Sequence, residues 1–444
     1  MIKLEEAPAV LTRSRFALPR TALAGAALAA GLVSPAQAAD TALNSANTAW
    51  ILTASALVLM MTLPGLAMFY AGLVRAKNVL SVMMHCVVIA CLSSVLWLAC
   101  AYSFAFDEGS PFLGGFGKVF LLSMGRDSLT GSLPESVFFL FQMTFAIITP
   151  ALIVGAFPER IRFAPVVLFS GLWLLLVYAP VTHWVWGGGW LMTRGIMDFA
   201  GGLVVHATAG ASALVVAAML GPRDGFPKEL RPPHNPGLTM IGAGLLWVGW
   251  YGFNGGSALT ADGAAGLAIL STHMSASVAG LVWMGLEWVR FGRPSMVGTV
   301  TGVVAGLATV TPASGFVGPL GGVILGMAGA VVCFFAVDFV KHRLKIDDTL
   351  DVFAVHGLGG ILGTVLVAFL AHPALQGAGY GEGGTVSGQL VTQLIGVVAV
   401  VAWSAIVTAI LVAGLRATIG LRASPDEIDE GLDLTYHGER SYTL

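Results

Sequence analysis

Two histidines follow an aspartate at the same distance along the chain. His206 comes eight residues after Asp198, and His356 comes eight residues after Asp348. Imidazole titrates near neutral pH and can both accept and donate a proton, so a buried pair could bind a small polar solute or relay its proton. A metal site is the rival interpretation, but it needs three or four ligands, and no further Asp or Glu is expected near these residues. We therefore expect neither a metal nor any other cofactor.

The composition indicates what must position these histidines. Of 444 residues, 56% are hydrophobic and 10% are charged, whereas a soluble domain carries about 25% charged residues. This excludes a soluble globular enzyme, a disordered chain and a disulfide scaffold. Ten runs of at least 23 residues contain no Asp, Glu, Lys or Arg, and about 20 apolar residues cross a bilayer as a helix. Uniform runs of this length also exclude an outer-membrane barrel.

One run, 294–337, is too long for a single crossing, and the Pro- and Gly-containing segment 311–315 divides it. The sequence thus predicts an all-α polytopic membrane protein with eleven transmembrane helices. One alternating set of loops holds 15 Lys and Arg residues and the other set holds 3. By the positive-inside rule the N-terminus lies outside and the C-terminus inside.

The ends of the chain differ from its middle. Residues 1–38 combine three arginines, an apolar stretch and an Ala-Gln-Ala motif, which predicts a cleaved signal peptide. We expect an eleven-helix domain over 39–418 and a cytoplasmic tail over 419–444. The N-terminus would be periplasmic after cleavage.

The repeated Asp-to-His spacing also predicts the topology. Asp198 and Asp348 would cap the N-termini of the fifth and tenth helices, which run in opposite directions. This indicates an inverted repeat of five plus five helices, followed by a long eleventh helix. Eight residues of helix rise about 12 Å, which would place His206 and His356 near the middle of a ~30 Å hydrocarbon core.

Several longer motifs carry a resemblance to a known family. They are WGGG at 186–189, DFAGG at 198–202, GFNGGS at 252–257, HG at 356–357, and GLD at 431–433 with HGE at 437–439 in the tail. In this order the motifs resemble the ammonium transporter family (Amt/Mep/Rh) across residues 39–444. The resemblance implies the eleven-helix inverted-repeat fold, a homotrimer with one pore per subunit, and no enzymatic activity.

The resemblance also implies roles for individual residues. Trp186 and Ser257, with Phe141 and Phe145, would form an outer recruitment site that Asp198 supports. Phe145 and Phe253 would form a gate, and His206 and His356 would line the pore and relay protons. Trp250 and Tyr178 would lie near the pore. Because Rh-type members usually lack the Trp and Ser, Trp186 and Ser257 favour the Amt branch.

The expected function is transport of ammonium or ammonia into the cytoplasm across a bacterial inner membrane. Ammonium would be recruited outside, deprotonated near the gate and conducted as ammonia past the histidines. Three alternatives stay open: an ammonium sensor acting through a PII-type (GlnK-like) signalling protein, a passive channel for neutral ammonia, and an intramembrane metalloenzyme. A PII-type protein is in any case an expected partner at the cytoplasmic face, alongside the lipid bilayer, and no nucleic-acid partner is expected.

Overall fold

The computed structural model describes residues 42–229, 232–381 and 383–442. The expected signal peptide, 1–38, lies outside these residues. The regular secondary structure of the described residues is helical apart from one short antiparallel hairpin, in which β1 (Leu129–Thr130) pairs with β2 (Leu133–Pro134).

The described residues of the first half, 42–229, contain nine α-helices, several extended by π-helical or 3-10 turns. They are α1 (Ser45–Met60), π turn Met61–Leu66, α2 (Ala67–Leu73), 3-10 turn Ala76–Asn78, α3 (Val79–Leu96), π turn Trp97–Ala101, α4 (Tyr102–Phe106), 3-10 turn Val119–Leu121, α5 (Glu135–Ile153), 3-10 turn Val154–Ala156, α6 (Phe163–Trp173), π turn Leu174–Tyr178, α7 (Ala179–Trp186), α8 (Trp190–Thr193), π turn Gly202–Ala207 and α9 (Thr208–Leu220).

The second half continues in the same manner and ends in two short helices. They are α10 (Pro236–Trp250), π turn Tyr251–Gly255, α11 (Gly263–Phe291), α12 (Met296–Val310), α13 (Pro319–Asp338), π turn Phe339–Arg343, π turn Phe353–Gly357, α14 (Leu358–Leu370), 3-10 turn Pro373–Leu375, α15 (Val386–Thr418), α16 (Pro425–Glu430) and α17 (Leu432–His437).

Among the described residues, nine continuous helical segments are long and apolar enough to cross a membrane. Two further helices, α10 with its π turn and α12, pack among them. The predicted break inside 294–337 is confirmed, since α12 ends at Val310 and α13 begins at Pro319. With 15 residues, α12 is about 22 Å long, shorter than a ~30 Å hydrocarbon core.

Small residues bring the helices of this bundle close together. A Cβ atom on Gly326 of α13 would lie 2.4 Å from the backbone oxygen of Ser275 in α11, and one on Gly363 of α14 would lie 1.9 Å from that of Thr309 in α12. Both positions belong to Gly-x-x-x-Gly pairs, whose spacing favours close helix approach.

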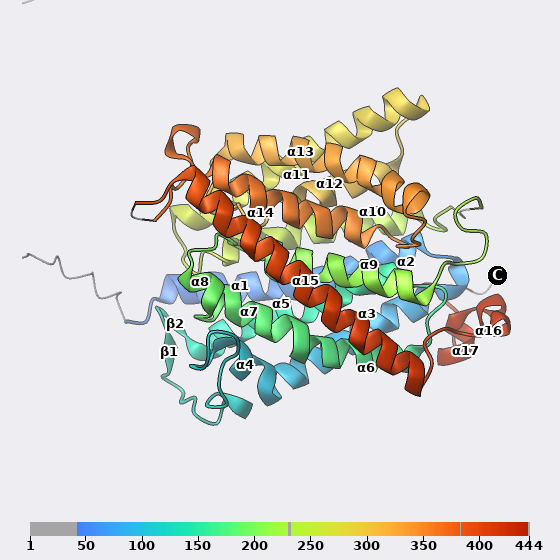
Figure 1. Ribbon diagram of the computed structural model, residues 1–444, viewed down its shortest axis with the longest axis horizontal. Helices are drawn as coiled ribbons and strands as arrows, with labels where there is room; N and C mark the ends of the chain where they lie inside the picture. Colours follow the sequence, from blue (N-terminus) through green and yellow to red (C-terminus); the bar gives the residue numbers. More distant parts are fainter. Residues whose placement is uncertain (1–41, 230–231, 382, 443–444) are drawn as a thin grey trace, which may run out of the picture. The chain divides into compact units, whose positions relative to one another are not determined.

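Within the bundle the long helix α15 crosses diagonally over its neighbours (Figure 1) and contacts α6, α9 and α14. The hairpin β1–β2 and α8 lie at one end, which we call the hairpin end. The helices α16 and α17 lie at the opposite end, the tail end (Figure 1). The helical segments that carry His206 and His356 lie side by side and antiparallel, because Gly210 faces Gly357 while Gly360 faces His206.

The expected starts of these two segments are wrong. The helices begin at Gly202 and Phe353, several residues after Asp198 and Asp348. The reason is a left-handed residue before each start, Gly201 with φ +111° and Asp351 with φ +61°, which interrupts the helical path. Each histidine therefore lies within the first, π-helical turn of its segment, and the predicted rise of about 12 Å does not apply.

Candidate functional site

His206 and His356 form a buried pair where their antiparallel helices meet. Their Nδ1 atoms are 3.3 Å apart, and their ring centroids are 5.2 Å apart with an angle of 21° between the planes. The close contact depends on glycine, because a Cβ atom on Gly210 would lie 2.2 Å from the Cα atom of Gly357. The structure thus brings together two residues that are 150 positions apart in the chain.

The pair can bind a polar solute with the nitrogen atoms that it leaves free. A contact between two Nδ1 atoms requires that one ring donates and the other accepts. His206 Nε2 is buried and has no hydrogen-bond partner among the described residues. His206 and His356 both line a small cavity whose other walls are apolar side chains, among them Met61, Leu66 and Ile148. A buried ring nitrogen without a partner is a group that a small hydrogen-bonding solute can satisfy.

An aromatic column leads from the histidine pair toward the hairpin end. The ring of His206 stacks on Trp250 at 5.5 Å and on Phe253 at 6.1 Å. Trp250 is fixed by a hydrogen bond of 2.9 Å from its Nε1 to Thr311 Oγ1. Trp250, expected only to lie near the pore, is therefore in direct contact with the histidine pair.

Two buried phenylalanines continue this column. The ring centroids of Phe145 and Phe253 are 4.3 Å apart, which is van der Waals contact for rings tilted by 35°. Both side chains are 1% exposed. Phe145 also contacts Trp186 edge-to-face at 5.9 Å and Phe141 at 5.1 Å. Four of the residues expected to form the recruitment site and gate are therefore contiguous.

Asp198 holds the beginning of the His206 helix and the indole of Trp186. Its carboxylate accepts hydrogen bonds from the N–H groups of Gly201, Gly202, Leu203 and Val204 at 2.5–3.1 Å, while its backbone oxygen accepts one from Trp186 Nε1 at 2.8 Å. Burial raises the pKa of Asp198, and these four N–H donors oppose that rise. The carboxylate thus caps a helix, as expected, and acts on Trp186 through the backbone.

Ser257 lies just after the π turn that carries Phe253, and its side chain is partly exposed. Its Oγ donates to the backbone oxygen of Phe253 at 2.8 Å, which leaves lone pairs free to accept. The preceding residue, Gly256, lies against the ring of Phe141. In the part of the chain that the structure describes, no hydrogen bond joins Ser257 to Trp186.

Tyr178 lies outside the column. It is fully buried, and its ring centroid is 6.1 Å from that of Trp97. Within residues 42–229, 232–381 and 383–442 it makes no ring contact with the gate or with the histidine pair, and its hydroxyl has no hydrogen-bond partner.

On the tail side the histidine pair borders a second cavity. This cavity of about 180 Å³ is lined by His356, Arg223, Lys341, Asp351 and Thr349 together with apolar side chains. Lys341 Nζ lies 2.6 Å from Asp351 Oδ1. The surroundings of the pair therefore change from apolar on one side of His356 to charged on the other.

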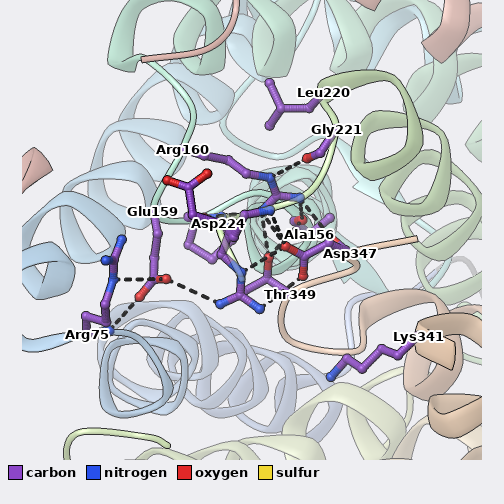
Figure 2. Close-up of polar contacts among 12 residues, drawn as sticks. Arg75, Ala156, Glu159, Arg160, Leu220, Gly221, Asp224, Lys341, Asp347 and Thr349 are labelled. Atoms are coloured by element: carbon purple, nitrogen blue, oxygen red, sulfur yellow. Dashed lines mark hydrogen bonds and ion pairs between the residues drawn. The ribbon is translucent and has the colours of Figure 1, made fainter. Parts of the chain in front are cut away.

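A buried arginine cluster supports the tail end (Figure 2) and was missed by reasoning from the sequence. Arg160 is 0% exposed and donates to the backbone oxygens of Gly221, Ala156 and Asp347 and to Thr349 Oγ1, at 2.7–3.0 Å. Burial lowers the pKa of Arg160 to about 10, although the charge of Asp347 opposes this. Its single guanidinium joins three loops that are far apart in the sequence and come together only in the folded chain.

Arg223 completes the cluster. It makes two hydrogen bonds to the carboxylate of Asp347, at 2.9 and 3.0 Å, and an ion pair with Glu159, which also pairs with Arg75. Burial alone would raise the pKa of Asp347, but hydrogen bonds from Arg223 and the charge of Arg160 lower it. In the sequence these arginines contribute only to the loop charge that predicts orientation.

The tail is docked on the tail end of the bundle. The carboxylate of Asp433 accepts the N–H groups of Leu80 and Ser81 at 3.0 and 2.7 Å, at the beginning of α3. Near Arg160, the backbone of 421–423 pairs with that of 160–162. The tail thus contacts the loop that carries the arginine cluster.

No group of three or more His, Cys, Asp or Glu residues suited to hold a metal ion occurs among the described residues.

Comparisons with known proteins identify the family of this chain. The sequence profile of the Ammonium Transporter Family matches residues 49–442. Ammonium transporter Amt1 of Archaeoglobus fulgidus is 43% identical over 405 residues, covering 90% of this chain and 100% of that protein. Mep2 of Candida albicans superposes with a TM-score of 0.82 at 36% identity, covering 90% of this chain and 94% of that one. A structure described as Sensor Amt Protein gives a TM-score of 0.83 at 31% identity, covering 88% and 98%. The chain is an all-α multi-pass membrane protein with the Amt/Mep fold, and it belongs to the ammonium transporter family.

Proposed function

We propose that this protein transports ammonium across a membrane, and that the solute passes the histidine pair as ammonia. The observation that carries the proposal is the buried contact between His206 and His356, which both line a small, largely apolar cavity, while His206 Nε2 has no hydrogen-bond partner among the described residues. Family membership supports the choice of ammonium as the solute. Proteins of this family are not enzymes, and the chain is a transporter in this proposal.

Recruitment would occur at Trp186, whose partly exposed indole adjoins Phe145. An indole face attracts a cation by about 0.5–2 kcal/mol as water is removed. Ser257 and Phe141 complete the site in this proposal, and Ser257 Oγ accepts one N–H of the ion. A potassium ion has no N–H to donate, so acceptance of hydrogen bonds distinguishes ammonium from it.

Deprotonation would occur where the solute leaves this site for the buried column. A full charge at the centre of a bilayer costs at least ~2.5–3.5 kcal/mol. With the lysine amine as a stand-in, pKa ~10.4, neutralising ammonium at pH 7 costs about 4.6 kcal/mol. The two costs are comparable, so loss of the proton competes with passage of the ion through the contact of Phe145 with Phe253. In the proposed route ammonia then exchanges hydrogen bonds with the histidines, which relay the proton separately.

The surrounding topology is part of the same proposal. Eleven crossings with an inverted repeat place the tail in the cytoplasm and the hairpin end in the periplasm of a bacterial inner membrane. The antiparallel segments that carry the two histidines, each beginning in a π turn, support such a repeat. In the proposal the chain forms a homotrimer, and a PII-type (GlnK-like) protein docks beside the tail.

The test is the transient current after an ammonium jump on purified protein in sealed liposomes, with a potassium jump as control. We expect an ammonium-specific current that His206→Ala abolishes, whereas the exposed His372→Ala leaves it unchanged. Internal alkalinisation without current would indicate conduction of neutral ammonia. Persistence of the current with unaltered ion selectivity in folded His206→Ala protein would refute the relay.

A sensor is the second candidate, and the similarity to the structure described as Sensor Amt Protein favours it. In that case the docked tail would transmit occupancy of the site to a cytoplasmic partner. If demonstrably folded protein gives neither a current nor internal alkalinisation, the sensor becomes the better-supported candidate.

A further inference from the structure

The cavity on the tail side of His356 contains a carboxylate that is paired with an alkylammonium group of the chain itself. Lys341 Nζ lies 2.6 Å from Asp351 Oδ1, and the two side chains are 13% and 21% exposed. Both residues line the cavity that His356 also lines. The head of a lysine is chemically a substituted ammonium ion with three N–H donors. The structure thus pairs a cation of this type with the carboxylate by charge, while Asp351 Oδ1 has no hydrogen-bond partner among the described residues and can still accept an N–H.

The other charges around the cavity are already matched. Arg223, which also lines it, is engaged by Asp347 and Glu159. In Figure 2, Lys341 stands apart from that arginine cluster. Loss of the charge of Lys341 would therefore leave Asp351 without an ion-pair partner among the described residues. Such a group attracts a small cation, because an unpaired, partly buried charge is costly.

The size of the cavity also fits such a ligand. A volume of about 180 Å³ has room for several water molecules, and an ammonium ion is close to water in size. The remaining walls include the apolar side chains of Phe69, Leu73 and Val304, and a low-dielectric surrounding strengthens the attraction between Asp351 and a cation beside it.

We propose that Asp351 is a binding site for a small N–H-bearing ammonium cation at the inner mouth, and that Lys341 occupies this site as a tethered competitor. The identity of the solute rests on the proposed function, but the site itself does not. A tethered group has a local concentration in the millimolar range or above. Lys341 thus keeps a free ammonium ion from remaining on Asp351, so the exit does not retain the solute.

The test compares thermal unfolding of purified full-length protein in ammonium chloride, potassium chloride and tetramethylammonium chloride at equal ionic strength. In Lys341→Gln we expect ammonium to raise Tm by about 1–2 °C over the other two salts at a concentration well above Kd. The double variant Lys341→Gln with Asp351→Asn should lack this increment. Lys345→Gln, which removes an exposed lysine four residues away, should behave as wild type.

Two results would overturn the proposal. One is an equal response of Lys341→Gln to potassium and ammonium, since the site would then not use N–H donors. The other is an ammonium increment that persists in the double variant, which would place the bound cation elsewhere, for example at Trp186. If Lys341→Gln does not fold, Lys341→Met read by native mass spectrometry with methylammonium as the probe provides the same comparison. Because binding is read without transport, a protein that carries no current can still show it, and the two proposals fail separately.

Discussion

The contact between Gly210 and Gly357 sets the distance between the two histidines, and Gly210→Ala should separate them. An alanine Cβ at position 210 would lie 2.2 Å from Gly357 Cα and 2.5 Å from Gly357 N. Both atoms belong to the backbone, so no side-chain rotation relieves the clash. Non-bonded carbon atoms sit about 3.5–4.0 Å apart, so the helices must move apart locally by about 1.3 Å or more.

This displacement is large compared with the contact that it disturbs. The Nδ1 atoms of His206 and His356 are 3.3 Å apart, and a further ångström removes the hydrogen bond. Loss of a neutral hydrogen bond costs about 0.5–1.5 kcal/mol, which predicts a fall in the ammonium current on the order of 2- to 10-fold. Overpacking should lower the free energy of unfolding by about 1–3 kcal/mol.

The assay is the liposome current, measured beside thermal unfolding of the same preparation. Gly414→Ala in α15 is the matched control, because a Cβ there meets no atom within 4 Å. We expect this control to keep full current and unchanged or slightly higher stability. A Gly210→Ala protein with wild-type current and wild-type stability would refute the reasoning, since the close approach would then set neither packing nor the histidine contact.

Three further outcomes follow from buried polar groups. Arg160→Lys should lower the free energy of unfolding by about 3–5 kcal/mol, because an ammonium group cannot reach all the acceptors of Arg160. The exposed Arg162→Lys is the control. Equal melting temperatures of the two variants would contradict a stabilising role for the hydrogen bonds of Arg160. Asp198→Asn should lower the free energy of unfolding by about 1–3 kcal/mol, since an amide N–H₂ would face N–H donors. Asp262→Asn, at an exposed helix cap, should lower it little. A larger loss of thermal stability in Asp262→Asn than in Asp198→Asn would contradict this prediction. Burial raises the pKa of Asp348 from 3.8 to about 7, so between these values the folded state binds more protons than the unfolded state, and stability should fall as pH rises from about 4 to 7. Asp348→Asn should flatten that part of a Tm-against-pH profile, and an unchanged slope would show that another group titrates.

The sequence predicted the membrane-spanning character because long charge-free runs have one physical solution in a bilayer. It also predicted the break within 294–337, where Pro and Gly act locally. The starts of the helices at Gly202 and Phe353 were missed, because the charge-free runs do not reveal the left-handed backbone at Gly201 and Asp351, a conformation that is uncommon for a residue such as Asp.

The candidate site was likewise predictable only in part. Motifs identified His206 and His356, and the structure brings them together. The position of the Trp250 ring depends on a hydrogen bond to Thr311, 61 residues away. The hydrogen bonds of Arg160 reach residues up to 189 positions away. Contacts of this range leave no periodicity or spacing in a single sequence.

The contact of Phe145 with Phe253 bears on how a membrane that contains this protein keeps its electrical potential. A potential of 100 mV is worth about 2.3 kcal/mol for each charge that crosses, and a continuous file of water would let protons flow down it. Rings in van der Waals contact at 4.3 Å leave no room for water between them. In the proposed route a solute passes there only when a ring moves aside, a motion of picoseconds to nanoseconds for unhindered side chains. On that route the column would admit one molecule at a time without a continuous file of water, so the protein would not dissipate the membrane potential.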